Sequence, residues 1–148
     1  MTAADEDGRN RDEAAVKRIE RLLCGEPFTK ALNIRLVSSG EGRAVLEMDI
    51  TAGLTNDKGI CHGGALFTLA DVAFGAAALQ DGTVVVTVGS DMHFLRPGRC
   101  GGVVRATAFL VSRTGRSGLF QVSLSDEAGG VVAAGMFKGQ WLPADRLA

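Results

Sequence analysis

The second half of the chain alternates between apolar and polar positions, and turn residues interrupt this alternation at intervals. A period of two residues is typical of strands that bury one face. Arg-Pro-Gly, Arg-Thr-Gly and Glu-Ala-Gly-Gly sequences separate the runs and predict turns. No helix-length segment lies between the runs, so we expect the strands to pair antiparallel as a meander. The four predicted strands are 83–94, 101–111, 119–125 and 131–141.

Two shorter alternating runs precede these strands. Leu32, Ile34 and Leu36 mark the first run, and residues 44–50 form the second. A Gly-Glu-Gly sequence at 40–42 lies between them and supplies a turn. This arrangement predicts a β-hairpin.

The N-terminal region has a different pattern. Helical spacing of apolar residues predicts an amphipathic packing or lid helix over residues 12–24, which Gly25 and Pro27 should end. Residues 1–12 are polar and charged, and they predict a disordered tail. We therefore expect a single domain over residues 13–148. The apolar positions of the predicted helix are Val16, Ile19, Leu22 and Leu23.

The segment 62–79 is rich in alanine and apolar on nearly every side. Its composition and length favour a helix, and its uniform hydrophobicity predicts burial all round. One buried helix with about six antiparallel strands predicts an α+β fold in which the sheet wraps the helix.

Asp71 is the only ionisable residue between Gly63 and Leu79. A buried carboxylate is costly unless it is paired or hydrogen-bonded, and no Lys or Arg lies within one helical turn of it. Asp71 is therefore a candidate catalytic carboxylate. The alternative is a structural role, in which Asp71 caps a loop or pairs with a distant arginine.

The helix begins with His62, Gly63 and Gly64. The first amide groups of a helix have no partner within it, and the helix dipole adds partial positive charge there. Glycines let a ligand oxygen approach these groups, as an oxyanion hole requires. A tight turn from loop to helix explains the same residues without any ligand.

Gly63 and Asp71 are eight residues apart, which places them about 12 Å apart along the helix axis. One thioester-sized carbonyl group cannot contact both residues of the same helix. If both act on one bond, they come from two antiparallel copies, so the active form is at least a dimer with shared sites.

Composition narrows the class of protein. The chain has 16 basic and 17 acidic residues, which argues against a nucleic-acid-binding footprint. Its three cysteines, Cys24, Cys61 and Cys100, form no C-x-x-C pair and predict a reducing compartment. The acidic N-terminus has no apolar stretch, and no segment is long enough for a membrane span. We expect a cytoplasmic protein without membrane or nucleic-acid partners.

One motif resembles a known family. Asn56, Gly59, His62, Gly63, Gly64, Leu69 and Asp71, followed by Phe-Leu-Arg-Pro-Gly at 94–98, resemble the PaaI-like branch of the hotdog-fold thioesterases. That branch includes the (hydroxy)phenylacetyl-CoA thioesterase of bacterial phenylacetate degradation. The resemblance covers roughly residues 28–141. It implies a hotdog fold, dimers often assembled into homotetramers, and hydrolysis of acyl-CoA thioesters without a metal or redox cofactor.

The resemblance also implies roles for single residues. Asp71 would act as general base or as nucleophile, and the Gly63 amide would donate to the thioester carbonyl. Asn56 would help to place the water or the carbonyl, with His62 beside it. Thr87 is the candidate for an assisting hydroxyl on the following strand, and Ser90 is the alternative. The acyl group stays open between phenylacetyl-type and aliphatic chains.

Further residues are candidates for substrate binding. Arginine's fork of donors suits the phosphates of coenzyme A, although exposed arginines in turns are often simply solvated. We expect the binding residues in the turns 96–99 and 113–118 and near the start of the helix. The candidates are Gly64, Phe94, Arg96, Gly98, Arg99, Arg113 and Arg116.

Other interpretations have less support. Cys61 and His62 are adjacent in sequence, and the side chains of neighbouring residues rarely point at each other. No third group is apparent that would orient them as a catalytic dyad. His62 and His93 lack further ligands at metal-like spacing, and we expect His93 to pair with Asp91 instead. A non-catalytic acyl-CoA sensor would carry a DNA-binding segment, which the short acidic tail does not provide. A hotdog hydratase or dehydratase would need a His–Glu or Asp–His pair on the helix, but His62 precedes the helix and no glutamate lies within it.

Overall fold

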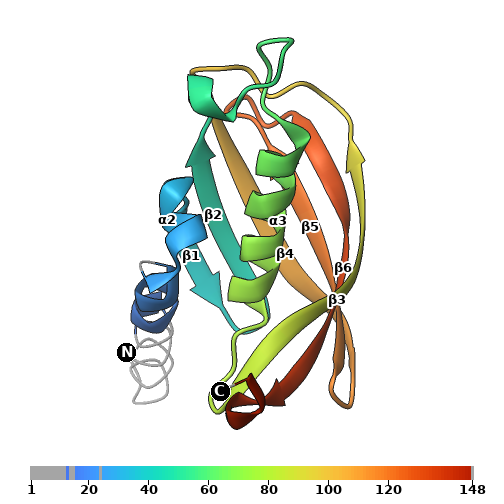
Figure 1. The fold of residues 1–148 in the computed structure, drawn as a ribbon. Coiled ribbons are helices and arrows are strands. Elements are labelled where there is room, and N and C mark those ends of the chain that lie inside the picture. The colour runs from blue at the N-terminus through green and yellow to red at the C-terminus, as the bar shows by residue number, and fades with distance from the viewer. Residues whose placement is uncertain (1–12, 14–15, 24, 148) are drawn as a thin grey trace, which may run out of the picture.

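The structure is a computed structural model, and it describes residues 13, 16–23 and 25–147. The predicted tail, residues 1–12, lies outside them. One six-stranded antiparallel sheet curves around helix α3 (Gly63–Ala77) (Figure 1). No helix in the described part of the chain is both long and apolar enough to cross a membrane. The other elements are α2 (Pro27–Ala31), β1 (Arg35–Gly40), β2 (Arg43–Asp49), η1 (Ala52–Leu54), β3 (Thr83–Phe94), β4 (Val103–Thr114), β5 (Ser117–Ser125), β6 (Val131–Pro143) and η2 (Ala144–Leu147).

The strand order is β1-β2-β4-β5-β6-β3. The hairpin β1–β2 and the meander β4–β5–β6 are as predicted, but the placement of β3 beside β4 was wrong. Both edges of β4 are occupied, by β2 and by β5, so β3 pairs with β6 at the far edge. The connection 95–102 then returns across three strand spacings, about 14 Å.

Helix α3 packs its apolar face into the concave side of the sheet. The Phe74 ring lies 5.1 Å from the Phe120 ring and 5.7 Å from the Phe137 ring, measured between centroids. Gly139 permits this packing, since a Cβ there would lie 2.5 Å from the Phe74 ring. The Trp141 indole N–H donates to the carbonyl of Ala78 at 2.7 Å and holds the end of the helix.

The predicted burial of this helix on all sides was wrong. One face of α3 is only half-buried or exposed, and its members recur three or four residues apart. In Figure 1 no described element lies in front of this face. The face is therefore available to a ligand or to a second copy of the chain. We call it the open stripe of α3; it consists of Gly64, Phe67, Thr68, Asp71, Val72 and Gly75.

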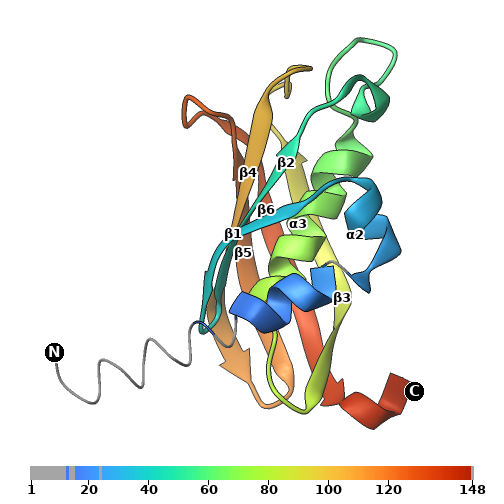
Figure 2. The same cartoon turned by 90° about the vertical axis from the view of Figure 1, so that its left-hand side faces the viewer.

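The N-terminal region differs from its prediction in detail. Residues 16–23 are helical as expected, but Gly25 is helical too, and Pro27 begins α2. The first strand starts at Arg35, not at Leu32, because Leu32 caps α2 and the next residue turns the chain with a positive φ. The N-terminal helical segment, residues 16–23, and α2 lie on the same side of the sheet as α3 (Figure 2).

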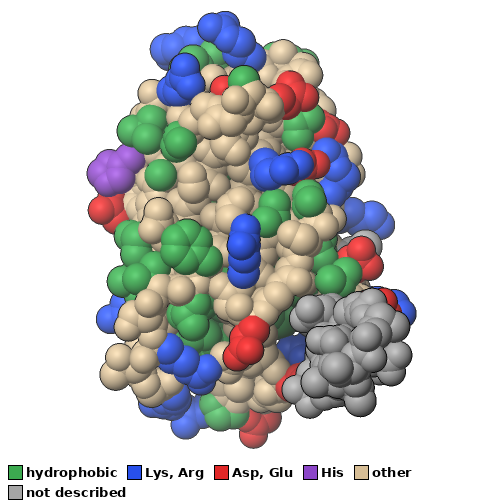
Figure 3. All heavy atoms as spheres, turned by 180° about the vertical axis from the view of Figure 1, so that it is seen from behind, with side chains coloured by type: hydrophobic (Ala, Val, Ile, Leu, Met, Phe, Trp, Pro, Cys, Tyr) green, Lys and Arg blue, Asp and Glu red, His purple; other side chains and the backbone are tan. Residues whose placement is uncertain are grey.

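The other side of the sheet is its outer face. Figure 3 shows hydrophobic side chains there, interspersed with charged ones. Phe109, Val111 and Leu119 are among the exposed apolar residues of β4 and β5. Asp91 and His93 lie on β3 with a carboxylate–imidazole distance of 3.2 Å, which is the pairing expected from the sequence.

Candidate active site

The start of α3 is held by the side chain of His62. His62 is the N-cap residue, and its Nδ1 accepts a hydrogen bond from the Gly64 amide at 2.9 Å. Its carbonyl accepts from the amides of Ala65 and Leu66. Among the described residues, the Gly63 amide alone in this first turn has no acceptor. One amide donor of the helix start is therefore free for a ligand.

The two glycines thus differ in role. Gly64 was predicted to contact substrate, but its amide is occupied, and a Cβ at this position would lie 3.0 Å from His62 Nδ1. Gly64 gives room to the capping imidazole. Gly63 lies beside Phe94, whose ring a Cβ on Gly63 would meet at 3.6 Å. Phe94 therefore lies beside the free amide, and its predicted contact with the substrate would occur there.

The loop before α3 is fixed by Asn56. Its side-chain Oδ1 accepts a hydrogen bond from the backbone amide of Lys58 at 2.9 Å, and its backbone amide donates to the Ile60 carbonyl at 2.8 Å. Local bonds of this kind stabilise a turn. The side-chain NH₂ of Asn56 has no partner among the described residues. Asn56 thus builds the loop with one side-chain atom and keeps a donor free with the other.

The turn after β3 packs against the same loop. The Cys61 amide donates to the Gly98 carbonyl at 2.8 Å, and Ile60 bridges to Arg99. Gly98 is buried, and a Cβ there would lie 2.9 Å from the Ile50 side chain and 3.1 Å from Cys61. Gly98 thus packs the turn against the loop, and its predicted role in substrate binding stays a prediction.

Asp71 lies on the open stripe, two turns after the free Gly63 amide. It is half-buried, and its Oδ1 accepts a hydrogen bond from Thr87 Oγ1 at 2.8 Å. The structure thus joins Thr87, not Ser90, to this carboxylate. A β-bulge at Val88 lets both Thr87 and Ser90 face the helix side, but Ser90 lies further along the strand, opposite Phe137.

No cation neutralises Asp71 in the part of the chain that the structure describes. Its Oδ2 has no hydrogen-bond partner there either. The structural roles considered above, a loop cap or an arginine pair, are therefore absent from these residues. The carboxylate has one oxygen held by Thr87 and one that is free to accept a proton.

Asp71 and Thr87 open into a cleft of about 850 Å³. The cleft lies between α3, the first half of β3 and the N-terminal helical segment. Its volume is within the range of ligand pockets in proteins. The sequence pattern predicted a packing or lid helix over residues 12–24 without a contact to Asp71, and in the structure Ile19, Leu22 and Leu23 line the same cleft as Asp71.

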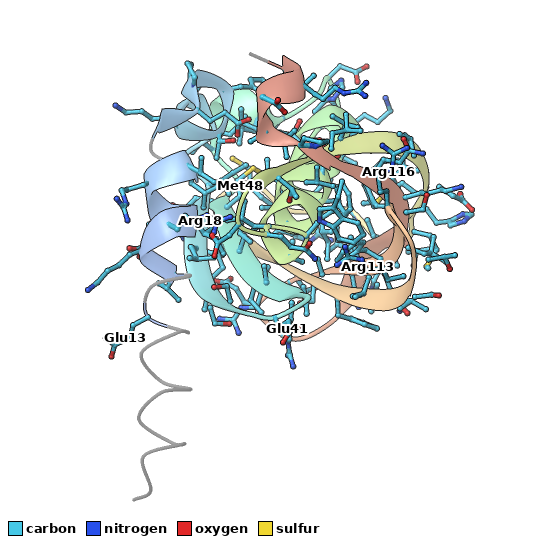
Figure 4. All side chains as sticks on the ribbon, turned by 90° about the horizontal axis from the view of Figure 1, so that it is seen from below. Glu13, Arg18, Glu41, Met48, Arg113 and Arg116 are labelled. Carbon is cyan, nitrogen blue, oxygen red and sulfur yellow. The ribbon has the colours of Figure 1, made fainter. Side chains whose placement is uncertain are left out.

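The predicted arginines do not form one patch. Arg96 and Arg99 lie in the turn next to the start of α3, whereas Arg113 and Arg116 lie at the β4–β5 hairpin (Figure 4). The Arg113 guanidinium stacks 4.3 Å above the Trp141 ring and donates to the Gly115 carbonyl. Both pairs lie in the turns expected from the sequence, and their role in binding coenzyme A stays a prediction.

Cys61 does not form a dyad with His62. Its thiol is buried and points to the His62 carbonyl at 3.7 Å, and burial raises its pKa to about 11. A buried neutral thiol is a poor nucleophile. The described residues contain no cluster of three or more His, Cys, Asp or Glu side chains that could hold a metal ion.

A long helix in the curve of a six-stranded antiparallel sheet defines the hotdog class of folds, and the half-buried Asp71 is the candidate catalytic residue on that helix. Comparisons with known proteins agree. The family model of the thioesterase superfamily matches residues 58–133. The acyl-coenzyme A thioesterase PaaI of Escherichia coli is 37% identical over 111 residues, which are 75% of this chain and 78% of that protein.

Solved structures extend the match. The E. coli PaaI protein from the phenylacetic acid degradation operon superposes with a TM-score of 0.84 and 31% identity, over 88% of this chain and 95% of that one. A mutant of the phenylacetic acid degradation protein PaaI from Thermus thermophilus gives 0.75 and 31%, over 79% and 100%. This chain belongs to the thioesterase superfamily, and it is a thioester hydrolase with the hotdog fold predicted from its motif.

Proposed function

We propose that this protein hydrolyses acyl-coenzyme A thioesters to a free acid and coenzyme A. The observation that carries the proposal is Asp71, a carboxylate that has no cationic partner among the described residues and that Thr87 holds at the mouth of an 850 Å³ cleft. The E. coli relative is an acyl-coenzyme A thioesterase, which supports the same substrate class.

In the proposed reaction, water is the only co-reactant. Asp71 Oδ2 takes a proton from water, and the water oxygen bonds to the thioester carbonyl carbon. The carbonyl oxygen gains negative charge, which the Gly63 amide and the helix dipole stabilise. The C–S bond then breaks, and the proton passes to the sulfur of coenzyme A. Asn56 orients the carbonyl or the water with its free NH₂ group.

The proposed site is shared between two copies of the chain, because eight residues separate Gly63 from Asp71 on one rigid helix. Strand β3 forms one edge of the sheet, and residues 87–91 on it are exposed beside the open stripe. Antiparallel pairing of two β3 edges would extend the sheet and set two α3 helices side by side in opposite directions. The free amide of one copy then faces the carboxylate of the other. Tetramers of such dimers are part of the proposal.

The first experiment measures free thiol released from a panel of acyl-CoA substrates that includes phenylacetyl-CoA. Asp71→Asn keeps the shape of the side chain and its hydrogen bond from Thr87 but removes the base. We expect turnover to fall by about 10²–10⁴, the usual contribution of a general base. Undiminished turnover in a folded Asp71→Asn protein would refute the proposed role. A single turnover in ¹⁸O-labelled water tests the alternative, because attack by Asp71 itself would leave unlabelled oxygen in the first product.

The second experiment tests sharing. Asp71→Ala and Gly63→Pro are each expected to be nearly inactive when expressed alone. Co-expressed with different affinity tags, they form mixed dimers in which one of the two sites has both native residues. About a quarter of native activity should return in the statistical mixture, since half of the dimers are mixed. No recovery in a purified mixed dimer means that each site lies within one chain.

A further inference from the structure

The cleft beside Asp71 is elongated along the axis of α3. Its lining begins at Asp71 and Thr87 and continues along α3 to Leu79 and then to Asp81. Asp71 and Leu79 are eight residues apart, so the cleft extends for about 12 Å along the helix axis. Between these ends the lining is mainly apolar. Such a trough is suited to an acyl chain whose carbonyl end lies at Asp71.

The wall opposite α3 comes from the N-terminal helical segment. Ile19 is buried against the core and anchors this segment, while Leu22 and Leu23 line the cleft. Arg18 makes an ion pair with Asp81, in the loop after α3, and this pair joins the segment to the far end of the cleft. Figure 4 shows Arg18 pointing from the segment toward the middle of the molecule. The cleft is thus bounded at the end remote from Asp71.

Gly75 gives an independent indication that this space is for a ligand. It lies one turn after Asp71 on the open stripe, in the middle of a helix where glycine is unfavourable. A Cβ on Gly75 would meet no atom within 4 Å, so packing within the chain does not require glycine there. Gly75 lines the same cleft, and its missing side chain widens the trough just beyond the carboxylate.

We propose that the N-terminal helical segment is the far wall of the acyl pocket, and that Leu22 and Gly75 set the length of the acyl chain that the enzyme accepts. This inference rests on the proposed thioesterase function. The preferred substrates are then medium-length aliphatic acyl-CoA thioesters, which fill the trough from Asp71 to the Arg18–Asp81 pair. Shorter acyl groups leave part of it empty, and longer ones meet the wall.

Two variants test the inference in opposite directions. Leu22→Ala shortens the wall and should raise the preference for long over short acyl chains. Gly75→Leu fills the trough and should lower it. Each change should alter the ratio of kcat/KM values by about tenfold or more, since single methylene groups in apolar pockets discriminate at this level. Neither variant threatens folding, because Leu22 is 53% exposed and leucine is a better helix former than glycine.

The measurement is kcat/KM for straight-chain acyl-CoA thioesters from acetyl to palmitoyl, and for phenylacetyl-CoA. Leu147→Ala is the matched control and should leave the native profile unchanged, because Leu147 is also an exposed leucine (63%) and lies on η2, outside the cleft. Identical chain-length profiles in the native protein and both variants would overturn the assignment. A loss in Gly75→Leu that is equal for all substrates would remove Gly75 from the pocket. If the native protein releases no thiol from any substrate, the proposed function itself fails.

Discussion

Among the described residues, hydrogen bonds engage every first-turn amide of α3 but one, whereas in the middle of the same helix Asp71 has a single partner and faces a cleft. His62, Asn56 and the turn 95–102 fix the first region, and the second is bordered by β3 and the N-terminal helical segment but left open. An oxyanion donor must be rigid before the charge forms. A base that handles water and an acyl chain needs access. The difference between the regions matches this division of tasks.

The largest expected effect concerns the single free amide. Gly63→Pro removes the N–H group but keeps the helix, because proline is tolerated at the first helical position. The preceding residue, His62, has φ −62° and ψ 135°, which suits a residue before proline. We expect kcat to fall about 10²–10³-fold.

Gly63→Ala is the matched control. It retains the amide, and its Cβ would lie in ordinary contact with the Phe94 ring at 3.6 Å. Its kcat should stay within a few-fold of the native value. Equal losses in the alanine and proline variants would mean that the backbone space matters and that the amide donor does not.

The second effect is a pH dependence of stability that comes from Cys61, in the first region. Burial keeps the Cys61 thiol neutral in the folded state and raises its pKa from 9.0 to about 11. Between these two pH values the thiol ionises in the unfolded state but not in the folded state, which stabilises the unfolded state. Stability from this group is therefore complete below pH 9 and is lost as pH rises toward 11, by about 2–3 kcal/mol. Urea unfolding of native and Cys61→Ala proteins across this range isolates the effect. Parallel pH curves for the two proteins would contradict the assigned burial.

The third effect tests the hydroxyl beside the base. Thr87→Val keeps the shape and the strand preference but removes the donor to Asp71 Oδ1. We expect an approximately tenfold loss of kcat, because a bond to a charged group contributes about 1.5–3 kcal/mol. Thr87→Ser should restore kcat. If Ser90→Ala loses more activity than Thr87→Val, the active state uses the other hydroxyl.

Sequence patterns predicted the parts of this comparison unequally. Alternation predicted both ends of β3 to the residue. The lone charge in an apolar helix singled out Asp71 as the candidate catalytic carboxylate. The open stripe was missed because an apolar surface reserved for a ligand or a partner has the same composition as a core. The far-edge position of β3 was missed because local periodicity carries no information on which distant strand is the neighbour. The role of Gly64 required the position of the His62 ring.

The smallest expected effect separates capping from chemistry at His62. His62→Ala removes the acceptor for the Gly64 amide and should cost about 1 kcal/mol of stability, the usual value of an N-cap. The Gly63 amide would lose part of its orientation, so kcat should fall by less than in Gly63→Pro. His62→Asn can cap the helix but cannot exchange a proton near neutral pH. If His62 acts through the cap, the asparagine variant recovers both stability and activity with an unchanged pH profile. Recovery of stability alone would instead make the imidazole a participant in proton transfer.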